Sequence, residues 1–385
     1  MTFQKTITET ALLAALEKGQ VRLPPLTFSD FQRLGHPPSA SGVPGGEALV
    51  TVWWQQRAYR FVVESRRLWT PKATQEAVDM LRRISAPPER YPLLLVPYLS
   101  EERLAELEAA GVSGVDLCGN GVVVVPGELL VLRSGAPNRF RWEGTIKNVY
   151  RKESSLAARI FLLVREFGSV GAVLEEIQRR GGELTLSTVS KVCKALEADL
   201  IIRRELRPPR VKRSPILPWG GQVPLAQPLR LLQPEKLLDL LAANYTPPQI
   251  SGRYTGKCEF APMVLREQLA GWAEGSGVRI ALTGASSVEA YAVMAREPVQ
   301  AFYCSDVEEV LRSLGDNVRE TDRFANVAFL ETSDGLAYFD RRPGLVASPV
   351  QTYLELVSGD KRERETAEQV RRVILEALAR DAGKE

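Results

Sequence analysis

The fold prediction starts from one stretch, residues 154–204: SSLAARIFLLVREFGSVGAVLEEIQRRGGELTLSTVSKVCKALEADLIIRR. Apolar residues recur in it at helical spacing, which predicts short amphipathic helices. The first two runs are Leu156, Ile160, Leu163, Val164 and Phe167, and then Val170, Val173, Leu174 and Ile177. Gly181-Gly182 ends the second helix, and Thr185 or Ser187 can cap a third that runs to about Ala198. A strand at Leu200–Ile202 follows, so three helices and a strand are expected to form one compact unit.

The third helix has two distinct faces. Its apolar residues fall at i, i+3, i+4 and i+7, so this stripe is expected to face the other two helices. The stripe consists of Val189, Val192, Cys193 and Leu196, and the opposite face presents Ser187, Ser190, Lys191 and Lys194, with Thr188 beside them. Hydroxyls can bond base edges or phosphates, and lysines neutralise phosphates. The pattern predicts a helix-turn-helix whose third helix lies in the major groove of double-stranded DNA.

A basic segment follows this helix. Within eleven residues it carries Arg203, Arg204, Arg207, Arg210, Lys212 and Arg213. Residues 145–213 hold fifteen lysines and arginines against eight aspartates and glutamates, an excess of seven positive charges, whereas the whole chain carries only +3. We interpret the segment as a wing that contacts the DNA backbone. The alternative is that it is a solvated linker beside three ordinary amphipathic helices.

Length and composition limit the number of domains and the class of protein. With 385 residues, 44% of them hydrophobic, the chain is long enough for two or three globular domains. No run approaches the ~20 apolar residues of a membrane span, and residues 1–19 lack the pattern of a secretory signal, so a cytoplasmic protein is expected. Four widely spaced cysteines and a single histidine, His36, argue against structural zinc and a serine-type triad. Neither a cofactor nor a metal is predicted.

The flanking regions both alternate between strand and helix patterns, which is typical of α/β domains. Four parts are therefore expected: an N-terminal α/β domain (1–145), a winged helix-turn-helix (146–213), a proline-rich linker (214–228) and a C-terminal α/β domain (229–385). In the first domain the expected strands are 48–54, 59–64, 93–96, 112–117 and 122–125, with helices at 8–18, 74–84 and 100–110. In the last domain the expected helices are 234–244, 262–275, 286–295, 349–357 and 364–379, with strands at 278–282, 301–304 and 327–331.

Several short motifs resemble the AbiEi-type antitoxins and transcriptional regulators of type IV toxin–antitoxin systems, in their long multi-domain form. The resemblance spans about residues 60 to 375. It rests on Tyr98-Leu99-Ser100, Asp116-Leu117-Cys118-Gly119-Asn120, Thr188-Val189-Ser190-Lys191-Val192, Leu237-Leu238-Asp239 through Tyr245, Ala281-Leu282-Thr283-Gly284 and Ser348-Pro349-Val350-Gln351-Thr352-Tyr353-Leu354.

The resemblance implies DNA binding through the winged helix and a C-terminal domain that acts on or beside a nucleotidyltransferase-like toxin. Long chains of this kind also occur alone, so both an antitoxin and a solitary regulator stay open. A homodimer is a further expectation, because paired half-sites raise affinity. The expected partners are thus double-stranded DNA, a nucleotidyltransferase-like toxin and a second copy of the chain, with no membrane.

Two motifs were weighed as enzyme sites. Glu64-Ser65-Arg66 is reminiscent of the restriction-endonuclease-like fold, but the preceding strand offers only Glu47 at its edge, and arginine stands where that chemistry needs lysine. The turn from Thr283 to Ser287 resembles the opening of a nucleotidyltransferase fold, but the next strand lacks the aspartate pair, with Asp306 only after it ends. We therefore expect degenerate nuclease-like and nucleotidyltransferase-like domains and no enzymatic activity. A metal-dependent nuclease and a protein-only toxin-neutralising adaptor remain the alternatives.

Overall fold

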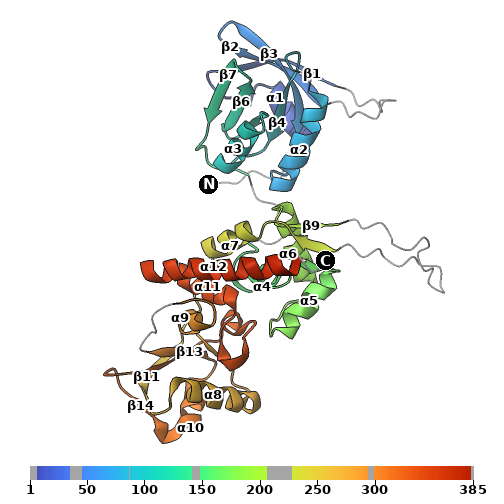
Figure 1. The fold of residues 1–385 in the computed structure, drawn as a ribbon. Helices are drawn as coiled ribbons and strands as arrows, with labels where there is room; N and C mark the ends of the chain where they lie inside the picture. Colours follow the sequence, from blue (N-terminus) through green and yellow to red (C-terminus); the bar gives the residue numbers. More distant parts are fainter. Residues whose placement is uncertain are drawn as a thin grey trace, which may run out of the picture. The chain divides into compact units, whose positions relative to one another are not determined.

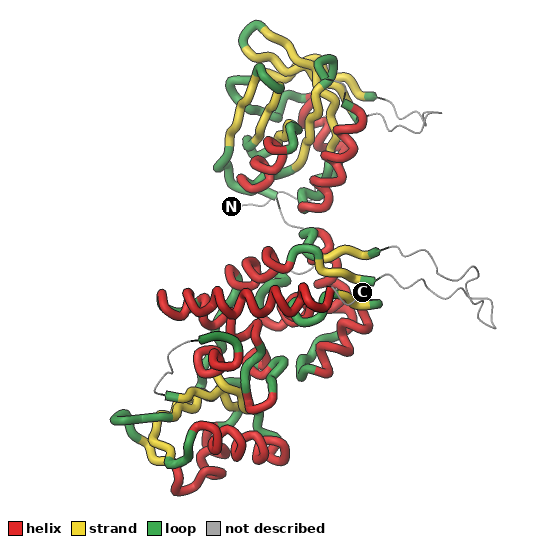
Figure 2. Tube along the Cα trace, viewed as in Figure 1, coloured by secondary structure: helices red, strands yellow, loops and turns green. Residues whose placement is uncertain are grey.

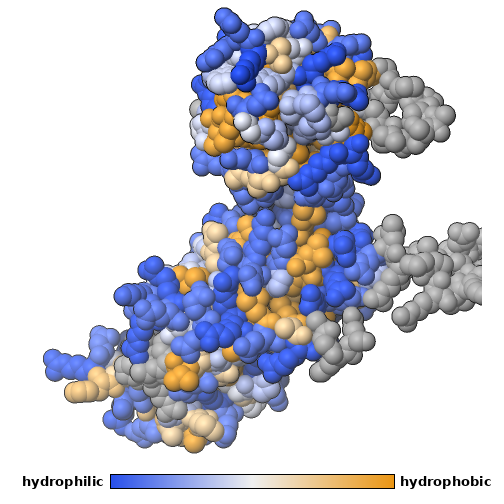
Figure 3. Space-filling model, turned by 45° about the horizontal axis from the view of Figure 1, so that its top comes forward, coloured by the Kyte–Doolittle hydropathy of each residue, from blue (hydrophilic) through white to orange (hydrophobic). Residues whose placement is uncertain are grey.

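The computed structural model describes residues 7–34, 46–85, 87–140, 148–205, 228–293 and 299–382. These residues form twelve α-helices and three β-sheets, so the predicted mixed α/β class is confirmed. The chain divides into two compact units, residues 1–145 and 146–385 (Figures 1 and 2). Among the described residues, no helix combines the length and apolar character that crossing a membrane requires. In the view of Figure 3, hydrophilic residues dominate the surface of both units, with apolar residues gathered in separate patches.

The first unit is built on a seven-stranded sheet with its strands in sequence order. The strands are β1 (Thr27–Arg33), β2 (Ala48–Trp54), β3 (Arg57–Ser65), β4 (Tyr91–Val96), β5 (Ser113–Asp116), β6 (Gly121–Val125) and β7 (Leu129–Arg133). β3, β4 and β5 run parallel, and the other neighbours are antiparallel. The strands expected at 48–54 and 59–64 form a hairpin: β2 pairs with β3 from Ala48↔Val63 to Trp54↔Arg57.

Helices cover both faces of this sheet. Leu12, Leu13 and Leu16 of α1 (Glu9–Glu17) pack on one face. α2 (Pro71–Ile84) and α3 (Glu101–Ala109) pack on the other through residues such as Leu81 and Leu107. The sequence prediction missed β1 and β7. β1 is a polar edge strand with no fully buried residue, so its sequence lacks the apolar alternation that marks a strand.

The second unit begins with three helices at the places that the sequence predicts, but the first is shorter than expected. They are α4 (Ser155–Phe161), α5 (Val170–Arg179) and α6 (Leu186–Ala198), and Thr185 caps α6. α4 ends at Phe161, and Phe167, which was expected on this helix, lies in the strand Glu166–Phe167 because it pairs with Leu229. The inward stripe of α6 is confirmed, since Val189, Val192, Cys193 and Leu196 are all fully buried. A short sheet of order β8-β10-β9 adjoins the helices, formed by β8 (Glu166–Phe167), β9 (Ile202–Arg204) and β10 (Leu229–Leu231). The strand expected at Leu200–Ile202 begins two residues later, because Leu200 has a left-handed backbone with a φ of 58°.

The boundary expected between residues 228 and 229 differs from the structure. Leu229–Leu231 pairs with both β8 and β9, so the chain returns to the three-helix unit after the proline-rich segment. Leu229 and Leu231 are buried in the core of that unit. The same core continues into α7 (Pro234–Ala243), α11 (Pro349–Val357) and α12 (Lys361–Ala382). Because one apolar core is shared, residues 146–385 form one compact unit.

The rest of this unit contains a five-stranded sheet of order β12-β13-β15-β11-β14. Its strands are β11 (Gly252–Cys258), β12 (Ile280–Leu282), β13 (Gln300–Cys304), β14 (Val318–Glu320) and β15 (Val327–Glu331). Its associated helices are α8 (Pro262–Ser276), α9 (Gly284–Ser287) and α10 (Val307–Leu314). The helix expected over 286–295 is wrong: α9 has four residues and continues only as a 3-10 turn at Val288–Ala290. β11, β14 and α10 were not predicted.

Candidate functional site

The outer face of α6 is open to solvent among the described residues. Ser187, Lys191 and Lys194 are exposed, and Ser190 is half-buried. Thr188 is used differently, because its hydroxyl lies 3.0 Å from that of Thr185 in the helix cap. The backbone N–H of Thr188 also donates to Thr185 Oγ1 at 3.2 Å. Four of the five polar residues predicted on this helix therefore face outward, and Thr188 helps to begin it.

Leu186 was missed by the sequence prediction. It begins α6 and is 53% exposed although it is apolar. An exposed leucine beside two serines gives this face an apolar contact as well as polar ones. Its exposure could have been predicted from the sequence, because Leu186 lies outside the buried i, i+3, i+4, i+7 stripe that begins at Val189.

The hairpin after α6 separates the two neighbouring arginines. Arg203 is 62% exposed at its side chain and lies 3.3 Å from Glu205. Arg204 points the other way and pairs with Glu197 of α6 at 3.1 Å, in a half-buried position. Successive residues on a strand face opposite sides, so only one of the two can meet a ligand. The structure gives Arg204 the role of fixing the strand to α6, in place of the backbone contact expected from the sequence.

A third arginine joins this surface from a distant part of the sequence. Arg230 of β10 lies directly across the sheet from Arg203. Glu205 lies 3.7 Å from Arg230 and 3.3 Å from Arg203, so its carboxylate is close to both guanidinium groups. On its other side Arg230 lies across the sheet from Glu166, so basic and acidic residues alternate over this part of the sheet. Of the other basic residues predicted here, Arg207, Arg210, Lys212 and Arg213 lie outside the described residues.

In the first unit, Glu64 is buried at the end of β3. One of its oxygens forms an ion pair with Arg66, and the other, Oε2, has no hydrogen-bond partner among the described residues. Glu47 is occupied: its Oε2 accepts from the backbone N of Ser65 at 2.7 Å and from the Ser65 hydroxyl at 2.5 Å. Arg66 thus supplies, beside the Glu64 carboxylate, the positive charge that a bound metal ion would supply in a nuclease.

Burial raises the pKa of the Glu64 carboxyl above its ordinary value, and Arg66 opposes this shift only in part. The folded protein then binds this proton more tightly than the unfolded chain does. The resulting stability is fully present below the unfolded pKa and is lost as the pH rises through the folded pKa. The free energy of unfolding of the native chain minus that of Glu64→Gln should therefore be largest below about pH 4.5 and should fall as the pH rises above it.

Urea denaturation below about pH 4.5 and near neutral pH measures the difference. Glu76→Gln is the matched control for the substitution itself, because Glu76 is exposed on α2. A Glu64→Gln difference that stays constant or rises with pH would contradict the burial argument.

The turn between β5 and β6 uses its polar groups internally. Asp116 Oδ1 accepts from the backbone N–H groups of Cys118, Gly119 and Asn120 at 2.7 to 2.8 Å. Its Oδ2 accepts from Leu99 N at 2.9 Å and from Asn120 Nδ2 at 2.8 Å. All of these bonds hold the chain to itself, so this strand end offers a ligand no free carboxylate.

The turn at the start of α9 is also filled by the protein. Gly284 N donates to Glu355 Oε2 at 2.6 Å, and a Cβ at position 284 would lie 2.8 Å from the Glu355 Cβ. The hydroxyls of Ser286 and Ser287 accept from the backbone N–H groups of Ala301 and Ala347, both at 2.9 Å. The donors and hydroxyls of this turn are therefore committed to internal bonds. Glu355 closes it from α11.

The described residues contain no group of three or more histidines, cysteines, aspartates or glutamates that could hold a metal ion. Compared with known protein families and with curated protein sequences, the chain matches none of them. The outer face of α6 and the hairpin beside it together form an exposed surface of hydroxyl, lysine and arginine side chains.

Proposed function

We propose that residues 148–205 and 228–231 form a winged helix-turn-helix that binds double-stranded DNA, and that the protein is a DNA-binding transcriptional regulator. The observation that carries this proposal is the two-sidedness of α6. Its inner stripe is fully buried, while Ser187, Lys191 and Lys194 are exposed on one continuous face. Nothing bulky or acidic stands between these three residues on the helix surface. Such a face suits the major groove, where hydroxyls meet base edges and lysines meet phosphates.

The hairpin supplies the second contact. The order of α4, β8, α5, α6, β9 and β10, with β10 between the other two strands, supports a winged arrangement. The Arg204 to Glu197 ion pair joins the hairpin to the proposed recognition helix, so that Arg203 and Arg230 keep a fixed place beside it. Both arginines would bind backbone phosphates next to the groove.

Arg203 should contribute one phosphate contact. We expect Arg203→Gln to reduce the slope of log affinity against log salt concentration by about one, since each neutralised phosphate contributes about 0.9. Fluorescence anisotropy with a labelled duplex at several salt concentrations measures this slope.

Arg204→Gln is the matched control, because Arg204 faces Glu197 and the protein interior. Its slope should equal that of the native chain. Equal slopes for all three proteins would remove the hairpin from the DNA interface, and a change with Arg204→Gln alone would reverse the two roles.

The proposal also extends to the residues outside the winged helix-turn-helix and to protein partners. Two features support the resemblance to AbiEi-type antitoxins. One is the arrangement of residues 148–205 and 228–231, and the other is the turn at Gly284, which Glu355 closes and which suits an inactive nucleotidyltransferase-like fold. A nucleotidyltransferase-like toxin and a second copy of the chain are the proposed protein partners. Duplex binding that weakens with salt would separate a regulator from a protein-only adaptor.

One observation favours a second candidate function, a metal-dependent nuclease of restriction-endonuclease-like fold. The unpartnered, buried Oε2 of Glu64 is an oxygen that a cation could use. Against it stand the Arg66 ion pair and the engagement of Glu47 by Ser65. Incubating the full chain with supercoiled plasmid and millimolar Mg²⁺ or Mn²⁺ decides between them. Cleavage that Glu64→Gln abolishes would establish the nuclease.

A further inference from the structure

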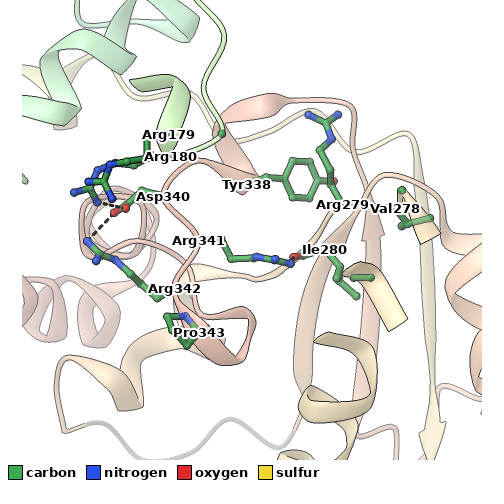
Figure 4. Close-up of a pocket in the computed structure, with 13 residues that line it drawn as sticks. Arg179, Arg180, Val278, Arg279, Ile280, Tyr338, Asp340, Arg341, Arg342 and Pro343 are labelled. Carbon is green, nitrogen blue, oxygen red and sulfur yellow. Dashed lines mark hydrogen bonds and ion pairs between the residues drawn. The ribbon is translucent and has the colours of Figure 1, made fainter. Parts of the chain in front are cut away.

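A pocket of about 590 Å³ lies between the end of α5 and the region around β12 (Figure 4). Five arginines line it: Arg179, Arg180, Arg279, Arg341 and Arg342. Asp340 is the only acidic residue among its lining residues. The arginines come from three separate parts of the sequence, and all belong to the second compact unit.

Three of the arginines are already paired with carboxylates. Arg180 and Arg342 converge on Asp340 from two sides, as the dashed lines in Figure 4 show. Glu176 of α5 forms ion pairs with both Arg179 and Arg180. These ion pairs join the end of α5 to Asp340, so Arg179, Arg180 and Arg342 have a structural role.

The other two arginines have no ion-pair partner among the described residues. The guanidinium group of Arg279 lies over the ring of Tyr338, 4.7 Å from its centre. Arg341 donates from Nη1 to the backbone oxygen of Ile280 at 3.1 Å. Arg279 also donates from Nη2 to the backbone oxygen of Ser333 at 3.4 Å. All of these partners are neutral, so each guanidinium group keeps its full charge and several of its donors.

The charges of the pocket do not balance. Five arginines line the cavity and Asp340 is the one acidic residue in the lining, while Glu176 pairs with two of the arginines from outside it. Burial raises the pKa of Tyr338, and Glu331 and Asp334 lie close enough to raise it further, so carboxylates offset part of the positive charge. Arginines that line one cavity still give it a positive potential, which favours an anion. Their planar, forked donors match the oxygens of phosphoryl groups in particular. Two linked phosphoryl groups can reach arginines that enter the cavity from different parts of its lining, as Figure 4 shows them, whereas a single carboxylate cannot.

We propose that this pocket binds a small phosphorylated anion carrying at least two linked phosphoryl groups, with Arg279 and Arg341 as its principal contacts. The cavity volume lies within the range of about 300 to 1,000 Å³ that is usual for small-molecule sites. The bound anion would bridge α5 and the five-stranded sheet, because Arg180 reaches the pocket from the former and Arg279 from beside β12. This site is separate from the α6 face and goes beyond the proposed function.

Isothermal titration of the full chain with inorganic pyrophosphate tests the proposal. We expect saturable binding at one site, and a rise in the melting temperature of about 5 to 10 °C at a concentration one hundred times the Kd. Arg279→Gln with Arg341→Gln should weaken binding by at least about 30-fold, because charged hydrogen bonds are lost. Arg341→Gln alone, which removes one of the two principal charged contacts to the anion, should weaken it by about 10-fold.

The matched control removes the same charge elsewhere in the unit. Arg312 and Arg372 are exposed on α10 and α12 and do not line the pocket, so Arg312→Gln with Arg372→Gln should bind as the native chain does. Absence of saturable binding to the native chain, or equal weakening by both double variants, overturns the proposal.

A second arm distinguishes a free phosphorylated molecule from a DNA phosphate. Pyrophosphate affinity is measured again with a saturating short duplex. Unchanged affinity supports a small-molecule site, whereas displacement by the duplex assigns the pocket to the DNA backbone and overturns it. The titration without DNA stands by itself, so its result is independent of whether the α6 face binds DNA.

Discussion

Reversing the charge of both lysines on α6, Lys191→Glu with Lys194→Glu, is expected to weaken duplex binding on the order of 100-fold at moderate salt. Both side chains are exposed, so the change replaces two attractions to phosphates by two repulsions and leaves the core untouched. Exposed substitutions of this kind usually alter the free energy of unfolding by less than about 0.5 kcal/mol. Anisotropy titrations with a labelled duplex measure the loss of affinity, and a urea titration checks the fold.

The control for this variant changes the net charge by the same amount. Lys257 and Lys361 are exposed on β11 and α12, and Lys257→Glu with Lys361→Glu should retain nearly the native affinity. If both double variants weaken binding equally, overall charge and not the α6 face attracts the duplex. If neither does, the lysines of α6 lie outside the interface.

The second large effect is expected in the first unit, at Asp116. Its carboxylate is almost fully buried and accepts five hydrogen bonds, four of them from backbone N–H groups. Asp116→Asn turns an amide NH₂ toward those donors, which leaves buried groups unpaired. We expect a loss of about 3 kcal/mol in the free energy of unfolding of this unit. Hydrogen exchange should rise first in residues 97–120, which these bonds connect.

Asp79→Asn supplies the comparison, since Asp79 is exposed on α2 and its replacement should cost less than about 0.5 kcal/mol. Exchange within residues 146–385 should be unchanged in both variants, because those residues form a separate compact unit. Native stability in Asp116→Asn would mean that the turn holds itself together without the carboxylate.

The features predicted well from the sequence are those fixed by local spacing. The stripe from Val189 to Leu196 follows from helical periodicity, and Thr185 caps α6 as its position before the stripe predicts. The β2–β3 hairpin follows from two apolar runs joined by a short turn at Gln55. In each case a few consecutive residues contain the whole signal.

The features that were missed depend on partners far away in the sequence. β10 has three residues and no recognisable period, and only pairing with β8 and β9 defines it. Arg230 was missed for the same reason. The pocket arginines at 179, 279 and 341 are separated by tens of residues or more, so no local pattern could group them.

The different surroundings of Arg203 and Arg204 could have been predicted from the sequence, because consecutive strand residues face opposite sides. Glu197 lies on the last turns of α6 and on the side that meets the strand, so the partner of Arg204 could have been inferred from helix periodicity.

Photo-crosslinking from position 187 tests the central claim most directly. A photoreactive amino acid replaces Ser187, which is exposed near the start of α6, and a second chain carries it at Met263, which is 66% exposed on α8. Both are irradiated with the same labelled duplex under conditions where the native chain binds it. The account predicts a covalent protein–DNA product from position 187 and none from position 263. A product from position 263 alone, or equal products from both, would contradict it.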